Sequence, residues 1–118
     1  MPSAPSGNSL NPRQCATVLK ALGDETRLQI LELLLVDEQC VTELVMKLRC
    51  AQPHVSHHLR ILRDAGLVEG LREGKQVCYR IAPTVKRALA NRQGQALNFG
   101  CCEVRFPEAT LMSLSHAR

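Results

Sequence analysis

The chain contains no tryptophan, and aromatic residues make up only 3% of the sequence. A hydrophobic core must therefore be built from leucine, valine, isoleucine and alanine, a composition that suits packed helices. The length of 118 residues corresponds to one domain, because compact domains mostly run to about 100–150 residues. A core of this size is modest, so an oligomer interface would add useful burial.

Long apolar segments are absent as well. No stretch is long enough to span a bilayer, and residues 1–11 lack the apolar core of a signal peptide. We therefore expect a cytoplasmic protein with no membrane partner. In that reducing compartment the six cysteines should be free thiols, which favours ligands, sensors or small core residues over a disulfide framework.

The net charge of +4 is mild, but the charges are unevenly distributed. Residues 23–48 contain six acidic and two basic side chains, whereas residues 49–87 contain eight basic and three acidic ones. A basic half is the expected surface for a polyanionic partner. A solvated charged face without a partner is the alternative interpretation of this pattern.

Apolar residues recur at spacings of three and four through the first half of the chain, which predicts helices. Pro12 fits the first turn of the first helix, and Asp24 is suited to cap the second, which is apolar nearly all round and should be central. Alternating residues then predict two strands joined by a turn at residues 72–75, in which Gly74 can be left-handed. The expected helices are 10–22, 25–36, 41–48, 52–64 and 84–91, and the expected strands are 67–71 and 77–81, with an extended segment at 97–106.

Residues 52–81 predict a helix followed by a β-hairpin wing. The turn before this helix, residues 49–51, has the three-residue length that a helix-turn-helix uses. One face of the helix carries short polar and basic side chains, which can read base edges in the major groove of DNA, while basic side chains hold the phosphates. The candidate DNA-binding residues are Gln52, His54, Ser56, His57 and Arg60 on the helix and Arg72 and Lys75 at the hairpin tip, and the inward stripe is Val55, Leu59 and Leu62.

Four segments of the chain resemble the ArsR/SmtB family of winged-helix metal sensors, and its arsenic-sensing members in particular. They are ALGDETRLQILELL, QCVTEL, QPHVSHHLRILRDAGLV and REGKQVCYRI, and the match covers residues 19–81. The resemblance implies a homodimer whose first and last helices form the interface. It also implies a repressor that occupies an inverted-repeat operator in double-stranded DNA and leaves when an inducer binds. Two positions depart from the family pattern, since Arg49 replaces a common glycine and Ala51 replaces the serine that usually caps the reading helix.

The expected fold is therefore mainly α with a β-hairpin wing, a homodimeric winged helix-turn-helix of the α+β class. Residues 1–9 are expected to form a disordered tail. Residues 10–96 are expected to form the DNA-binding and dimerisation domain. Residues 97–118 form a C-terminal extension that contains the candidate sensing site.

The family's known metal sites are incomplete in this chain. The arsenic and cadmium site of the family uses a Cys-Val-Cys sequence, whereas this chain has Cys40 followed by valine and threonine, so Cys40 is expected to be a core residue. The family's zinc site on the last helix uses carboxylate and histidine ligands, but residues 84–95 contain no Asp, Glu or His. Cys50 and Cys78 are expected to serve packing.

The adjacent Cys101 and Cys102 offer a different site. Vicinal cysteines rarely serve packing alone, because neighbouring side chains in an extended segment point opposite ways. A bend at Gly100 would direct both sulfurs to one soft ion. Trivalent arsenic or antimony prefers three thiolates, so As(III) or Sb(III) is the expected inducer, without an organic cofactor. Cys15 is the candidate third ligand, since the resemblance places the first helix against the partner's C-terminal region, although Cys15 also lies on the apolar face of its own helix.

Other inputs and another class of protein remain open. Paired thiols, for example Cys40 with Cys101, would also form a disulfide or polysulfide bridge in a redox or persulfide sensor, and cadmium or lead would suit soft ligands too. A small thiol reductase is the alternative from another class, but the chain has no Cys-x-x-Cys motif and no phosphate-cradling loop, so we expect no enzyme. His54, His57 and His58 have chelating spacings, but in a groove-reading helix a bound metal would compete with DNA.

Overall fold

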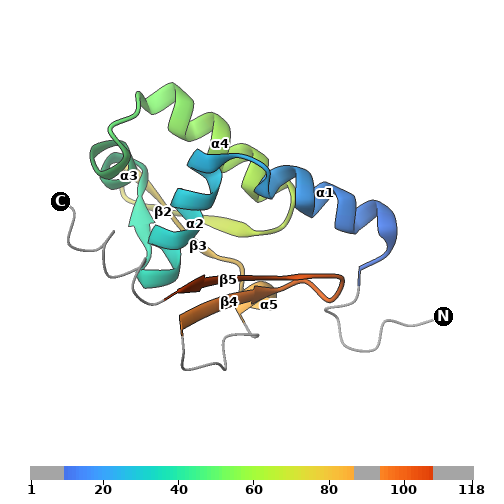
Figure 1. Cartoon of the computed structure of the whole chain (residues 1–118). Coiled ribbons are helices and arrows are strands. Elements are labelled where there is room, and N and C mark those ends of the chain that lie inside the picture. The colour runs from blue at the N-terminus through green and yellow to red at the C-terminus, as the bar shows by residue number, and fades with distance from the viewer. Residues whose placement is uncertain (1–9, 87–93, 108–118) are drawn as a thin grey trace.

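The computed structural model describes residues 10–86 and 94–107 as a helical layer with a small three-stranded sheet and a separate C-terminal hairpin (Figure 1). This arrangement confirms the predicted winged helix-turn-helix of mainly α content. The elements in chain order are α1 (Pro12–Leu22), α2 (Glu25–Val36), β1 (Gln39–Cys40), α3 (Val41–Leu48), α4 (Gln52–Asp64), β2 (Val68–Glu73), β3 (Gln76–Ile81), α5 (Pro83–Lys86), β4 (Gly94–Asn98) and β5 (Glu103–Pro107).

Side-chain caps define the first two helices. Asn11 accepts a hydrogen bond from the Gln14 backbone N–H at 2.8 Å, and the Gln14 side chain accepts one from the Asn11 backbone N–H at 3.1 Å. Asp24 accepts from the Arg27 backbone N–H at 3.1 Å, as its predicted role as N-cap requires. Because each cap satisfies a donor that the first helical turn leaves unpaired, both helices begin close to where the sequence predicts.

The junction between α3 and α4 contains both departures from the family pattern. Arg49 ends α3 in the left-handed region at φ 57°, a conformation that glycine adopts without steric cost. Ala51 occupies the N-cap position of α4 with extended backbone and makes no side-chain cap. The helix-turn-helix is therefore formed here without the two residue types that favour its backbone.

Serine at the α4 N-cap should strengthen this junction. Ala51→Ser is expected to raise the free energy of unfolding by about 0.5–1 kcal/mol, because its hydroxyl would accept from the first turn of α4. The gain lies at the lower end of the usual range because the His54 N–H already donates to the Ala51 carbonyl at 3.0 Å. Urea denaturation measures the change, with Ala51→Gly as the control without a hydroxyl; an equal gain in that control would exclude capping as the cause.

The wing is longer than predicted. Strands β2 and β3 pair from Val68↔Ile81 to Glu73↔Gln76, so Arg72 lies in a strand and only Gly74 and Lys75 form the turn. Gly74 has φ 66°, which confirms its predicted left-handed conformation and allows so tight a turn. On the other edge of β3, the two-residue strand β1 pairs with it and gives the sheet order β1-β3-β2.

The C-terminal region differs from the expected single extended segment. Strands β4 and β5 form an antiparallel hairpin with Asn98↔Glu103 as its innermost pair, and β4 begins at Gly94, before the expected boundary at residue 97. Helix α5 is described for Pro83–Lys86, and the rest of the helix expected at 84–91 lies outside the described residues. The tail expected at residues 1–9 also lies outside them.

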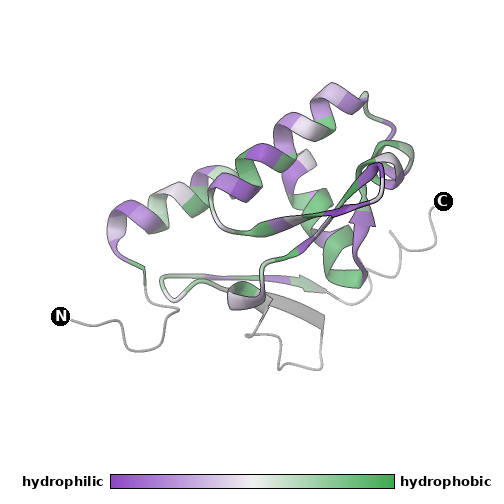
Figure 2. Cartoon of the chain, turned by 180° about the vertical axis from the view of Figure 1, so that it is seen from behind, coloured by the Kyte–Doolittle hydropathy of each residue, from purple (hydrophilic) through white to green (hydrophobic). Residues whose placement is uncertain are grey.

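The core lies between α2, the inner face of α4 and the sheet. Helix α2 is central, as predicted, and its Ile30 and Leu31 are fully buried together with Leu59 of α4. Leu97 and Phe106 of the C-terminal hairpin join the same cluster. The hydropathy colours alternate along the helices, as expected for elements with one buried face (Figure 2). Among the described residues, no helix combines the length and apolar character that crossing a membrane requires.

Candidate nucleic-acid interface and thiol site

Helix α4 carries the predicted polar face on its solvent side. Its inward stripe of Val55, Leu59 and Leu62 is fully buried. This stripe fixes the rotation of the helix about its axis, so the other side chains have a defined direction. The five candidate DNA-binding residues of this helix are exposed, namely Gln52, His54, Ser56, His57 and Arg60.

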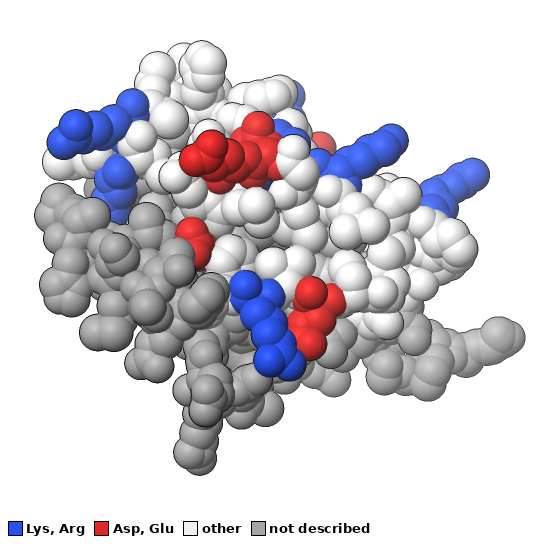
Figure 3. All heavy atoms as spheres, viewed as in Figure 1, with Lys and Arg blue, Asp and Glu red and all other residues white. Residues whose placement is uncertain are grey.

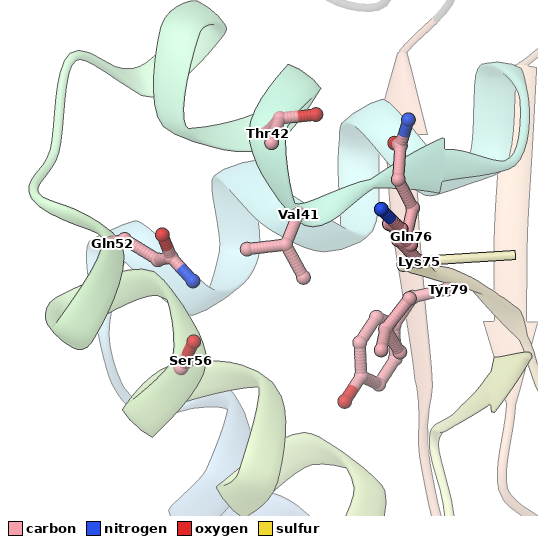
Figure 4. A pocket seen from close by; sticks show the side chains of 8 residues that line it. Val41, Thr42, Gln52, Ser56, Lys75, Gln76 and Tyr79 are labelled. Atoms are coloured by element: carbon pink, nitrogen blue, oxygen red, sulfur yellow. The ribbon is translucent and has the colours of Figure 1, made fainter. Parts of the chain in front are cut away.

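The wing lies beside the start of α4 and encloses a cleft with it. The cleft has a volume of about 250 Å³ and its lining comes from α3, α4 and the wing (Figure 4). Gln52 and Ser56 lie on the α4 side, with Tyr79 and Lys75 opposite. The Tyr79 ring lies against Gly70, where an added Cβ would come within 3.1 Å of it. Hydroxyl, amide and ammonium groups therefore converge on one groove, which suits a phosphate backbone.

The charges of the described surface are mixed in sign. On the face drawn in Figure 3, basic and acidic side chains are interspersed rather than gathered into one patch. Glu69 and Arg80 of neighbouring wing strands pair at 3.0 Å, which neutralises that part of the wing. Arg72 and Lys75 are exposed near the hairpin tip. Exposed basic groups that can meet a polyanion include Arg72 and Lys75 near the tip and Arg60 on α4.

His58 differs from the other histidines of α4 because its side chain turns inward and is only 15% exposed. Its Nδ1 lies 3.2 Å from Arg27 Nη1 and 3.8 Å from Asp24 Oδ2. Burial is the main cause that lowers the pKa of His58, while the Asp24 carboxylate opposes it. The hydrogen bond from the Arg27 backbone is the main cause that lowers the pKa of Asp24. A neutral imidazole therefore links α4 to the start of α2, a role that no motif in the sequence indicated.

The three candidate metal ligands lie together. The sulfur atoms of Cys15, Cys101 and Cys102 are all within 4.8 Å of one another. The turn of the C-terminal hairpin brings the vicinal pair there: Gly100 has φ 88° and the Phe99 N–H donates to the Cys102 carbonyl at 2.9 Å. In Figure 1 this turn lies on the side where α1 begins.

The cluster is formed within one chain, whereas the resemblance placed Cys15 against the partner's C-terminal region. Cys15 and Cys101 are joined as a disulfide with their Cα atoms 6.2 Å apart, and Cys102 Sγ lies 3.8 Å from Cys101 Sγ. Cys15 and Cys102 are half-buried and Cys101 is exposed. Three soft donors without a carboxylate or imidazole among them suit a soft thiophilic ion once the disulfide is reduced.

A second disulfide joins Cys40 and Cys78, which face each other in the pairing of β1 with β3. This corrects the expectation that Cys40 is a core residue, because Cys40 is half-buried. Its partner is Cys78 and not Cys101, the pairing given as an example of the redox alternative. The expectation of free thiols also differs from the structure, because the fold brings two pairs to bonding distance. Cys50 and Cys102 are the free cysteines of the described chain. Sequence reasoning missed the Cys40–Cys78 pair because a two-residue strand such as β1 leaves no periodic signal.

Comparisons with known proteins find relatives of the helix-turn-helix part of the chain. The model of the family "Bacterial regulatory protein, arsR family" matches residues 24–70. An HTH-type transcriptional regulator of Methanocaldococcus jannaschii, MJ1325, is 45% identical over 62 residues, which cover 52% of this chain and 70% of the relative. The arsenical resistance operon repressor of Escherichia coli K12 is 44% identical over 69 residues, which cover 58% of this chain and 59% of that repressor.

A solved structure resembles the fold at a comparable level. The homodimeric winged helix-turn-helix DNA-binding domain of Mb0332 from Mycobacterium bovis superposes with a TM-score of 0.58 and 41% identity. The superposition covers 59% of this chain and 65% of that one. From the sequence match to MJ1325, the family model and this shared architecture, the chain belongs to the ArsR family of bacterial transcriptional regulators.

Proposed function

We propose that the protein is a repressor that binds operator DNA as a homodimer and leaves it when As(III) or Sb(III) binds Cys15, Cys101 and Cys102. The observation that carries this proposal is the approach of the three sulfurs to within 4.8 Å of one another. Trivalent arsenic and antimony are soft ions that favour thiolate ligands. The similarity to a repressor of arsenical resistance supports the same class of inducer.

Capture of arsenite is balanced in atoms and protons by the cluster alone. As(OH)₃ exchanges its three hydroxyl groups for three thiolates, and the three thiol protons leave with them as three water molecules. The Cys15–Cys101 disulfide removes two of the thiols, so the reduced chain is the form that binds. Cys101 is the exposed member and offers the first point of attack.

On the DNA side, α4 would enter the major groove with its exposed polar face, and the wing would hold the neighbouring backbone. The homodimeric state of Mb0332 supports a pair of reading helices that meet two half-sites of an operator. Arsenic would tie α1 to the C-terminal hairpin and shift the spacing of the two helices. A typical allosteric coupling of about 1–3 kcal/mol corresponds to about a 5–150-fold change in operator affinity.

The test is operator release measured by fluorescence anisotropy with arsenite added to the reduced protein. The proposal expects release at about one arsenite per chain and operator binding that falls steeply with salt, since phosphate contacts release counterions. Stable operator binding at several equivalents of arsenite, with three reactive thiols verified per cluster, would contradict the sensing role. Failure to bind any fragment of its own promoter would contradict the DNA-binding role.

Cys40 provides a separate prediction. Cys40→Ser is expected to leave arsenite-dependent release unchanged within about twofold, because Cys40 lies beside Cys78 and outside the cluster. In relatives with the Cys-Val-Cys sequence, the equivalent position would be a ligand, so the same substitution should abolish release there. A large loss of release in this chain would move the sensing site to α3. The measurement is the arsenite concentration at half release.

A redox or persulfide input is the second candidate, since Cys15 and Cys101 are joined as a disulfide with Cys102 adjacent. A two-electron oxidant such as peroxide would take two hydrogens from the two thiols and be reduced to water. Release by peroxide or persulfide, with no response to arsenite, would favour this input. Mass spectrometry separates a disulfide from an added sulfur bridge.

A further inference from the structure

Arg27 connects two helices that the proposed function requires to move together. Its side chain starts in the first turn of α2 and runs back to the end of α1. Nε donates to the Ala21 carbonyl at 2.6 Å and Nη2 donates to the Lys20 carbonyl at 3.3 Å. Carbonyls of the last helical turn lack partners within the helix and form its negative end, so a guanidinium suits them. Arg27 therefore fixes the end of α1.

The same guanidinium reaches the reading helix. Arg27 Nη1 lies 3.2 Å from His58 Nδ1, and His58 belongs to the middle of α4. A guanidinium only donates, so the Nδ1 atom accepts. Burial favours the neutral imidazole that this bond needs, as the lowered pKa of His58 indicates. One side chain thus binds the end of α1 and the inward side of the helix whose outer face is the candidate DNA reader.

An open surface depression lies beside this bridge. It has a volume of about 300 Å³ and lies where α1, α2 and the end of α4 meet. Its lining includes Arg27, Thr17 and Ala21 of α1, and Ile61 and Asp64 of α4. Close packing transmits any displacement between helices, whereas a gap does not. The depression leaves α1 and α4 room to shift at this edge, where the polar contacts of Arg27 join the end of α1 to His58 of α4.

We infer that Arg27 is a positioning residue that transmits the state of the thiol cluster from α1 to the reading helix α4. The inference rests on the proposed function and names the route of its coupling. Cys15 lies on α1 little more than one turn before Lys20. Closing three thiolates on one ion holds α1 against the turn of the C-terminal hairpin in a position set by the ion rather than by the disulfide. The displacement of the end of α1 moves the guanidinium that is bonded to its carbonyls. The hydrogen bond from the guanidinium to His58 then moves α4.

The test separates binding from release. Arg27→Met keeps an unbranched apolar stem of similar length and removes all donors, while Arg13→Met makes the same change at an exposed arginine of α1. For each protein, arsenite affinity is measured by loss of reactive thiols, and operator affinity is measured with and without arsenite. Arg27→Met is expected to bind arsenite within about threefold of wild type but to change operator affinity less than about twofold, against about 5–150-fold for wild type. Arg13→Met should match wild type in both.

His58 supplies a conservative rescue that a merely structural role would not produce. His58→Asn places an amide oxygen near the position of Nδ1 and is expected to retain most of the release, whereas His58→Leu fills similar space without an acceptor and should lose it. Urea denaturation of each variant gives its stability, and variants of equal stability are compared. Equal release by His58→Leu and His58→Asn would overturn the role of this hydrogen bond.

The outcomes for the two proposals differ. If wild type releases the operator with arsenite and Arg27→Met releases it equally, the positioning role of Arg27 is wrong and the proposed function stands. Oxidation of Cys15 and Cys101 to the disulfide provides a second perturbation of α1 that does not require arsenite. If neither arsenite nor this oxidation changes the operator affinity of wild type, both the positioning role of Arg27 and the sensing role are wrong. If oxidation but not arsenite changes the operator affinity of wild type, arsenic is not the inducer. Loss of the response to oxidation in Arg27→Met would then still support the positioning role of Arg27.

Discussion

The double substitution Cys101→Ser/Cys102→Ser is expected to abolish release of the operator by arsenite while leaving operator affinity without arsenite within about twofold of wild type. Two of the three soft donors are replaced by hydroxyls, which are poor ligands for a thiophilic ion. The double variant should therefore lose the whole coupling, about a 5–150-fold change in operator affinity. Both residues lie in the turn of the C-terminal hairpin, away from the exposed face of α4, so DNA binding itself should persist.

The matched control for this result is Cys50→Ser. Like Cys102, Cys50 is a free, half-buried cysteine, but it lies between α3 and α4 and outside the thiol cluster. It should release the operator as wild type does. Thiol titration adds an independent readout, since arsenite should protect three thiols per chain in wild type and in Cys50→Ser. Release by the double variant at wild-type arsenite concentrations would exclude this cluster as the sensor.

Two neighbouring positions on α4 are expected to respond in opposite ways. Leu59 is fully buried against the core, so Leu59→Ala should lower the free energy of unfolding by about 2–5 kcal/mol through lost apolar contacts and the cavity that remains. Arg60 is exposed on the candidate DNA face, so Arg60→Ala should change stability by less than about 0.5 kcal/mol. The same Arg60 change should weaken operator binding by about 1–3 kcal/mol if it holds a base edge.

Urea denaturation and operator anisotropy on the same two variants form the experiment. Each variant serves as the control for the other, because both truncate a side chain on the same helix at adjacent positions. The salt dependence of operator binding separates two roles for Arg60: a phosphate contact reduces the slope by about one, whereas a base contact leaves it nearly unchanged. If both variants bind the operator as wild type does, the DNA-binding surface lies elsewhere on the fold.

Local signals in the sequence predicted most of the DNA-binding half. Pro12 and Asp24 mark helix starts through backbone chemistry that acts within one turn, and Gly74 marks a turn through its own φ. The recurrence of apolar residues at spacings of three and four predicted which face of α4 is buried. These features depend on residues close together in the chain, so a sequence carries them directly.

Features that depend on tertiary contact were less visible. The Arg27–His58 bond joins residues 31 positions apart, and Cys40 meets Cys78 only once β1 has paired with β3. Soft-ligand chemistry singled out Cys101 and Cys102, and the choice of Cys15 depended on a family resemblance that implied a partner chain. The C-terminal hairpin escaped prediction because its strands alternate weakly and its turn contains the two cysteines rather than a typical turn pair.

A thiol cluster formed within one chain affects how operator release depends on the concentration of arsenite. Each protomer of a dimer would contain a complete site, so a dimer can bind arsenic in one protomer while the site of the other is vacant. A dimer of one wild-type and one serine-substituted protomer would still bind one ion with full affinity, whereas a shared interchain site would lose a ligand at both ends. The steepness of operator release against arsenite concentration then measures how strongly arsenic in one protomer weakens the binding of the other protomer to its half-site. A shallow release curve corresponds to graded rather than all-or-none derepression.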